Sequence, residues 1–196
     1  MLYYKINEQS NPKKVIYYFH GGAYINEPLT FHWRYLVKLA QNTNFTIVVP
    51  IYPKLPRNTH EECYRVIHSL YTQLEKKYDA PFIFMGDSAG GGLALGFAQD
   101  VKKEGKKKPE QIVLHSPWLD VTGEHPDYLK IQKLDPMLGL AGAQELGKLW
   151  ANGQDPKYYK ISPLNGDLTD IGRITVFVGT AELVLVDAQL LLEKAK

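Results

Sequence analysis

The segment Phe82-Ile-Phe-Met-Gly-Asp-Ser-Ala-Gly-Gly-Gly92 decides the fold of this chain. An apolar run leads into Gly86-Asp87-Ser88-Ala89-Gly90, and a helical stretch follows at once. A G-x-S-x-G sequence between a strand and a helix is typical of a serine held on a sharp, strained turn. The hydroxyl of Ser88 is therefore expected to project from the carboxyl edge of a sheet, beside a helix N-terminus that favours negative charge.

A glycine-rich phosphate loop is the alternative interpretation of this segment. The segment lacks the Lys-Ser/Thr ending of a P-loop and the spacing of a dinucleotide-binding turn. We therefore predict that Ser88 is a nucleophile.

Short β-rich runs alternate with helical stretches on both sides of this segment. Most are continuous apolar runs, as expected for strands buried on both faces of a mostly parallel sheet. The clearest helix spans residues 60–78, with a capping box from Thr59 and Glu62. The chain is thus predicted to form a single α/β domain over residues 1–196, with helices on its mostly parallel sheet. The predicted strands are residues 3–6, 15–19, 46–51, 82–85, 112–114 and 174–178.

Composition excludes several functional classes. Lysine and arginine number 23 against 21 acidic residues, a balance that disfavours nucleic acid as a partner. No apolar run is long enough to span a membrane and no secretory leader is visible, so we expect a cytoplasmic protein without a membrane partner. Scattered histidines and the single Cys63 predict no metal site. The basic run 102–108 is interpreted as a solvated loop, with a phosphate-binding patch as the alternative.

A second glycine motif, His20-Gly21-Gly22-Ala23-Tyr24, follows the run at residues 15–19. Acyl transfer generates an oxyanion, which preorganised backbone N–H donors stabilise. We predict that the amides of Gly21, Gly22 and Ala89 form this oxyanion hole. His20 is interpreted as an anchor of the loop rather than as a base.

The motifs HGGAY, GDSAGGG, HSPWLD (115–120), ISPLNGDL (161–168) and VGTAE (178–182) occur in this order. Together they resemble the bacterial hormone-sensitive-lipase-like branch of the α/β-hydrolase fold, over residues 14–190. The resemblance implies an eight-stranded sheet, a Ser–acid–His triad, no cofactor, and esterase or lipase activity on small-molecule carboxylic esters.

The resemblance places the triad acid just after the run at residues 174–178. Glu182 occupies that position, and Asp187, expected to cap the next helix, is the alternative. The triad histidine should follow the acid, yet no histidine follows Glu182. The chain is therefore expected to be truncated at both ends, to lack the last strand and to hydrolyse esters poorly. The upstream histidines besides His20 are His32, His60, His68, His115 and His125.

Substrate preference is read from aromatic residues near the motif loops. Tyr24, His32 and Trp118 are candidates for an apolar pocket that accepts short- to medium-chain esters, whereas His60 and His68 are expected at the surface. A non-catalytic ligand-binding remnant and a serine peptidase of the same fold remain alternatives. The run at residues 174–178 is expected at a sheet edge, where self-association is possible.

Overall fold

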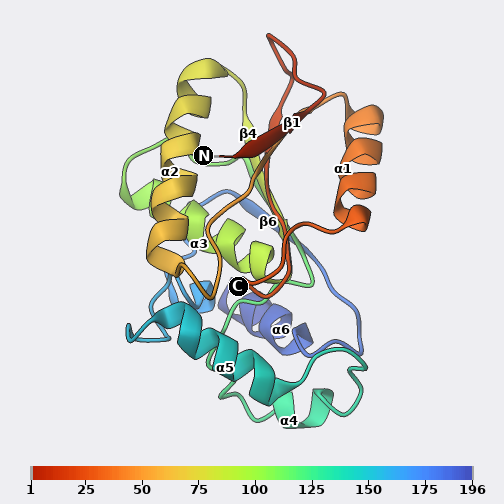
Figure 1. Ribbon diagram of the computed structural model, residues 1–196, viewed down its shortest axis with the longest axis vertical. Coiled ribbons are helices and arrows are strands. Elements are labelled where there is room, and N and C mark those ends of the chain that lie inside the picture. The colour runs from red at the N-terminus through yellow and green to blue at the C-terminus, as the bar shows by residue number, and fades with distance from the viewer. Residues whose placement is uncertain (1, 196) are drawn as a thin grey trace.

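The computed structural model describes residues 2–195, which build one six-stranded sheet flanked by helices (Figure 1). The strand order is β1-β3-β2-β4-β5-β6, and every neighbouring pair except β1 and β3 is parallel. The predicted mostly parallel α/β sheet is confirmed. The strands are β1 (Tyr3–Ile6), β2 (Val15–Phe19), β3 (Thr46–Pro50), β4 (Phe82–Asp87), β5 (Gln111–His115) and β6 (Arg173–Phe177).

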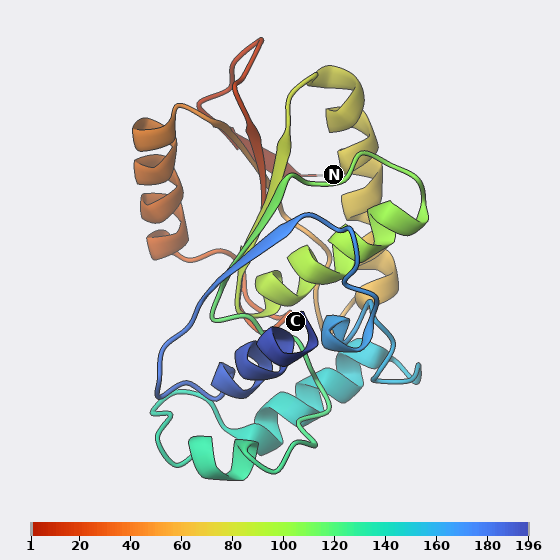
Figure 2. The same ribbon diagram turned by 180° about the vertical axis from the view of Figure 1, so that it is seen from behind.

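Helices cover both faces of the sheet and close its carboxyl edge. Helix α1 lies on one face, whereas α2 and α3 lie on the other (Figures 1 and 2). Helices α4, α5 and α6 gather below the carboxyl ends of the strands (Figure 1). The helices are α1 (Thr30–Thr43), α2 (His60–Lys77), α3 (Ala89–Lys103), α4 (Tyr128–Ile131), α5 (Leu140–Ala151), the 3-10 turn η1 (Pro163–Asn165) and α6 (Leu185–Lys194).

Strand β2 illustrates why the apolar runs are continuous. All five of its residues are buried, and successive side chains point to opposite faces of the sheet. Tyr17 joins the core beneath α2 and α3, while Tyr18 joins the smaller core beneath α1. A strand covered on both faces needs apolar residues at every position, and this sequence supplies them.

Helix α2 begins as its sequence predicts, with Glu62 accepting hydrogen bonds from the backbone and the hydroxyl of Thr59. The expected surface placement of His60 and His68 is wrong. His60 is buried, with Nδ1 2.9 Å from the backbone oxygen of Trp150, because the end of α5 packs over the start of α2. The side chain of His68 is only 13% exposed and faces α3. Their burial depends on segments distant in the sequence.

The basic run 102–108 forms the last turn of α3 and the mostly exposed loop after it, and its lysines pair with nearby carboxylates. Lys102 lies 2.7 Å from Asp167, and Lys108 pairs with Asp170. Exposed ion pairs of this kind contribute little to stability. The pairing favours the interpretation as a solvated loop over a phosphate-binding patch.

Strand β6 differs from the inner strands. Within residues 2–195 it pairs only with β5, and no residue of it is fully buried. Phe177 at its end is 56% exposed. Among the described residues, no helix combines the length and apolar character needed to cross a bilayer.

Candidate active site

Ser88 occupies the turn between β4 and α3. Its backbone has φ 49° and ψ −122°, a left-handed region that non-glycine residues adopt only under strain. Hydrogen bonds hold this conformation: the N–H of Ser88 donates to the oxygen of His115 over 3.0 Å, and the oxygen of Ser88 accepts from Gly92 and Trp118. The strained turn that the G-x-S-x-G sequence predicts is present.

The glycines beside Ser88 permit a close approach of three elements. A Cβ atom on Gly86 would lie 2.2 Å from the oxygen of Gly90, and a Cβ atom on Gly90 would lie 2.0 Å from the oxygen of Phe19. Both distances are far below van der Waals contact. Only glycine lets β2, β4 and the start of α3 pack together at this point.

The loop after β2 lies directly beside the Ser88 turn. The N–H of Gly21 donates to Oδ1 of Asp87 over 2.9 Å, so this amide is not free to serve in the predicted oxyanion hole. The amides of Gly22, Ala23 and Ala89 donate to no protein acceptor within residues 2–195. Ala23 was not among the predicted donors, because the bond that engages Gly21 instead comes from a side chain distant in the sequence.

Asp87 fastens the glycine loop to the sheet. Its Oδ1 also accepts from the hydroxyl of Tyr18 over 2.5 Å, and its Oδ2 lies 3.1 Å from Nε2 of His32. Burial raises the pKa of this carboxyl, but the hydrogen bonds from His32 and Tyr18 outweigh burial and leave the pKa below its usual value. His32 is therefore buried beneath the loop, and its predicted place at the pocket is wrong.

His20 is buried and held within the same loop. Its Nδ1 lies 2.7 Å from the oxygen of Gly21, and its ring stacks on Tyr52 with centroids 4.4 Å apart. Burial lowers the pKa of His20 to about 4, so the ring is neutral at neutral pH. This arrangement is consistent with the expected anchoring role.

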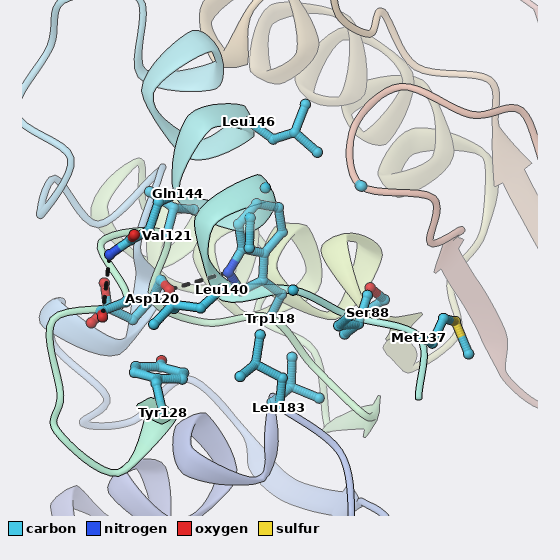
Figure 3. A pocket seen from close by; sticks show the side chains of 17 residues that line it. Ser88, Trp118, Asp120, Val121, Tyr128, Met137, Leu140, Gln144, Leu146 and Leu183 are labelled. Atoms are coloured by element: carbon cyan, nitrogen blue, oxygen red, sulfur yellow. Dashed lines mark hydrogen bonds between the residues drawn. The ribbon is translucent and has the colours of Figure 1, made fainter. Parts of the chain in front are cut away.

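A mostly apolar pocket of about 240 Å³ opens beside Ser88 (Figure 3). Ser88 and Met137 lie on one side of the group of side chains that Figure 3 draws, and Asp120 and Gln144 lie on the other. Trp118 lines this pocket, whereas Tyr24 does not. The ring centroid of Tyr24 lies 4.1 Å from that of Trp150 and 5.5 Å from that of Trp118. The prediction that Tyr24 lines the pocket is wrong. The lining includes Ala23, Val121, Tyr128, Met137, Leu138, Gly139, Leu140, Gly142, Ala143, Leu146, Leu183 and Val184.

The two candidate acids after β6 have different surroundings. Oε2 of Glu182 is buried and meets no hydrogen-bond partner within residues 2–195. The next residues in the chain, Leu183 and Val184, line the pocket. Glu182 thus carries a buried acceptor that is free to hold an imidazole.

Asp187, in contrast, is fully buried and fully engaged. It accepts hydrogen bonds from the amides of Leu119 and Asp120, at 2.5 and 3.2 Å, and from the hydroxyl of Tyr128. Burial outweighs these hydrogen bonds and raises the pKa of Asp187 to about 7. The expected capping role is wrong, because the side chain bonds the segment after β5 and α4 rather than its own helix.

No histidine lies in the pocket beside Ser88 within residues 2–195. His115 contributes its backbone oxygen to the Ser88 turn, but its ring stacks on Phe177 with centroids 5.4 Å apart. His125 does not line the pocket, and its Nδ1 lies 3.7 Å from Oδ2 of Asp127. Within residues 2–195 the pocket therefore has a serine and unpaired backbone amides beside it, and no imidazole.

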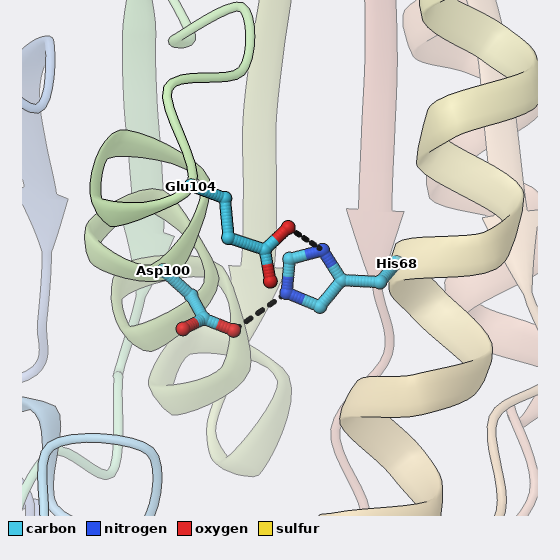
Figure 4. A group of neighbouring side chains, drawn as sticks. All are labelled: His68, Asp100 and Glu104. Carbon is cyan, nitrogen blue, oxygen red and sulfur yellow. Dashed lines mark hydrogen bonds and ion pairs between the residues drawn. The ribbon is translucent and has the colours of Figure 1, made fainter.

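A separate cluster of His68, Asp100 and Glu104 lies between α2 and α3 (Figure 4). Nε2 of His68 is 2.5 Å from Asp100 and Nδ1 is 3.4 Å from Glu104. Lys160 pairs with Asp100 and Lys106 pairs with Glu104, each over 2.8 Å. This cluster was not predicted from the sequence, and the two lysines balance the charge of its two carboxylates.

Comparisons with known proteins converge on one family. A family model described as alpha/beta hydrolase fold matches residues 16–196. An esterase of Acinetobacter venetianus is 29% identical over 98% of this chain and 64% of its own length. A triacylglycerol lipase of Mycobacterium tuberculosis is 32% identical over 83% of this chain and 33% of its own length. The crystal structure of an esterase from the bacterial hormone-sensitive lipase family superposes with a TM-score of 0.87 and 26% identity, over 95% of this chain and 63% of that one.

Proposed function

Because the chain belongs to the α/β-hydrolase fold family, we propose that this protein hydrolyses carboxylic esters with Ser88 as the nucleophile. The observation that carries the proposal is the strained Ser88 turn, which opens on an apolar pocket that Ala23 also lines. The chain spans about 64% of the length of the Acinetobacter esterase, so we propose, rather than observe, that it shares the ester hydrolysis of a full-length esterase.

In the proposed reaction, Oγ of Ser88 attacks the ester carbonyl carbon and the carbonyl oxygen becomes an oxyanion. The amides of Gly22, Ala23 and Ala89 would donate hydrogen bonds to that oxygen. Each such donor is worth about 3–4 kcal/mol in the transition state. Collapse of the intermediate expels the alcohol and leaves an acyl-serine, which water then hydrolyses.

Glu182 is proposed as the triad acid, because its buried Oε2 is unpaired in residues 2–195 whereas Asp187 is fully hydrogen-bonded. A carboxylate in this role orients the imidazole that accepts the serine proton. Without an imidazole in the pocket, turnover falls by about 10⁶-fold in a serine protease. We therefore expect this chain by itself to hydrolyse esters slowly.

The test is hydrolysis of p-nitrophenyl butanoate by this chain. Ser88→Ala should abolish the activity. Ser69→Ala, which alters an exposed serine on α2, should leave it unchanged. Hydrolysis that survives Ser88→Ala would overturn the proposal.

Non-catalytic ligand binding is the second candidate, and the lack of a histidine among the pocket residues of the described chain favours it. It predicts saturable binding of esters without turnover and no labelling by a fluorophosphonate probe. Labelling that Ser88→Ala removes would exclude it in favour of the hydrolase.

The substrate proposed is a short- to medium-chain ester. A cavity of about 240 Å³ is roughly one and a half times the size of an engineered cavity of about 150 Å³ that binds benzene. Its mostly apolar lining suits a hydrocarbon chain rather than a charged group.

Self-association through β6 is also part of the proposal. Three features support it: one side of β6 has no partner strand within residues 2–195, Phe177 is exposed, and Ile174, Val176 and Leu192 line an apolar groove. A second copy could pair with this edge through backbone hydrogen bonds.

A further inference from the structure

Gly139 and Gly142 differ from the other glycines of this chain. The sequence has 16 glycines, all within residues 2–195. Every one except these two either has a positive φ or would bring a Cβ atom within 3.0 Å of another atom. A Cβ atom on Gly139 or Gly142 would meet nothing within 4 Å. Neither the backbone nor the packing therefore requires glycine at these positions.

Both residues line the pocket beside Ser88. Gly139 precedes α5 as its N-cap, where glycine is tolerated, but Gly142 lies in the first turn of the helix. Glycine forms helices less readily than every residue except proline. The missing side chain at Gly142 thus weakens the helix and leaves open space at the pocket wall.

Gly147, in the same helix, shows the contrast. A Cβ atom there would lie 2.7 Å from Cβ of Val121, so packing against the segment after β5 explains that glycine. No such contact exists at Gly142. Gly142 is exposed and lines the pocket, so a side chain there would extend into the open space at the pocket wall.

We propose that Gly142 determines the length of the acyl chain that the pocket accepts. The hydrocarbon chain of the ligand lies along the bare backbone of Gly142, beside the side chains of Leu138 and Leu146 and opposite Trp118. Among the lining residues described, Asp120 is the only Asp, Glu, Lys, Arg or His, which suits a neutral hydrocarbon chain. This inference rests on the proposed function, because it takes the ligand to be the acyl part of an ester.

The test measures binding rather than turnover, so that it does not depend on catalysis. Dissociation constants of straight-chain alkanoates from butanoate to decanoate are determined by calorimetry for the parent chain and for Gly142→Leu. Ala141→Leu is the matched control, because Ala141 neighbours Gly142 on α5, is exposed and does not line the pocket. Gly142→Ala serves as a second variant if the leucine variant does not fold.

In the parent chain, affinity should rise with each added carbon of the alkanoate. Gly142→Leu should weaken decanoate binding at least tenfold and butanoate binding less than twofold, and Gly142→Ala should have a smaller effect of the same kind. Ala141→Leu should change neither. An unchanged chain-length dependence in Gly142→Leu, an equal loss in Ala141→Leu, or no alkanoate binding by the parent chain would overturn the inference.

Hydrolysis of p-nitrophenyl butanoate, measured in parallel, separates this inference from the proposed function. If Gly142→Leu abolishes the chain-length dependence but no Ser88-dependent hydrolysis is found, the role of Gly142 is supported and the proposed ester hydrolysis is contradicted. If Ser88-dependent hydrolysis is found but the chain-length dependence is unaltered, ester hydrolysis is supported and the role of Gly142 is contradicted.

Discussion

The centre of the sheet and its β6 edge are organised in opposite ways. Around Ser88, backbone groups from β2, β4 and α3 lie so close that a single added Cβ atom would collide with main-chain oxygens. Around β6, side chains are half exposed, one side of the strand is unpaired within residues 2–195, and Glu182 keeps a buried oxygen without a partner. The proposed nucleophile is thus held by close backbone packing, whereas the proposed acid lies where contacts are fewer.

The largest expected effect contrasts a glycine of the centre with a glycine of the edge. Gly90→Ala should cost about 4 kcal/mol or more of unfolding free energy, because its Cβ would meet the backbone oxygen of Phe19 at 2.0 Å. Gly179→Ala should cost less than about 1 kcal/mol, because its Cβ meets only the mobile end of the Glu182 side chain. Urea unfolding of both variants checks this. Similar losses in the two would contradict the contrast in packing.

A smaller effect concerns the buried carboxyl of Asp187 on α6. Burial raises its pKa to about 7 in the folded protein, whereas an unfolded aspartate titrates near about 4. Between these values the folded state holds the proton and the unfolded state does not, so the stability contributed by this group falls as pH rises. The expected slope is at most about 1.4 kcal/mol per pH unit.

Asp187→Asn tests this directly, because an asparagine cannot ionise. The pH dependence of its unfolding free energy between about pH 4 and 7 should be flatter than that of the parent chain. Parallel pH profiles for the two proteins would show that Asp187 titrates normally.

Asp87, at the centre, should behave in the opposite direction. Hydrogen bonds from His32 and Tyr18 outweigh burial and lower its pKa, so its contribution is present above about pH 4 and is lost as pH falls further. Asp87→Asn should cost about 1–3 kcal/mol at pH 7, and the cost should shrink toward pH 3. Denaturant titrations at both pH values measure this, and a cost that grows on acidification would refute the assigned direction.

The smallest effect on stability is expected at the edge. Phe177→Lys alters an exposed side chain and should change the unfolding free energy by less than about 0.5 kcal/mol. The lysine should nevertheless suppress self-association, because charged residues on an edge strand oppose strand pairing. Sedimentation velocity at rising concentration compares the two chains. A parent chain that stays monomeric at all concentrations would contradict the proposed self-association through β6.

Local patterns predicted the parts of the molecule that local physics controls. The alternation of apolar runs and helices predicted the sheet, and the spacing of Gly86, Ser88 and Gly90 predicted the strained turn. Contacts between residues far apart in the sequence could not be predicted from local patterns. The hydrogen bond from Gly21 to Asp87, the burial of His60 beneath Trp150 and the engagement of Asp187 by Tyr128 each join residues more than fifty positions apart. Such contacts exist only once the chain has folded.

The aromatic stack of Trp118, Tyr24 and Trp150 couples the oxyanion loop to the distant end of α5. Tyr24 directly follows Ala23, and its ring lies parallel to that of Trp150 at 4.1 Å. The amides proposed to receive the oxyanion therefore depend on two attachments of the same loop, the bond from Gly21 to Asp87 in the sheet and the stacking of Tyr24 on Trp150 in α5. A change that displaces residues 140–151 should disturb these amides even where the bond to Asp87 is intact.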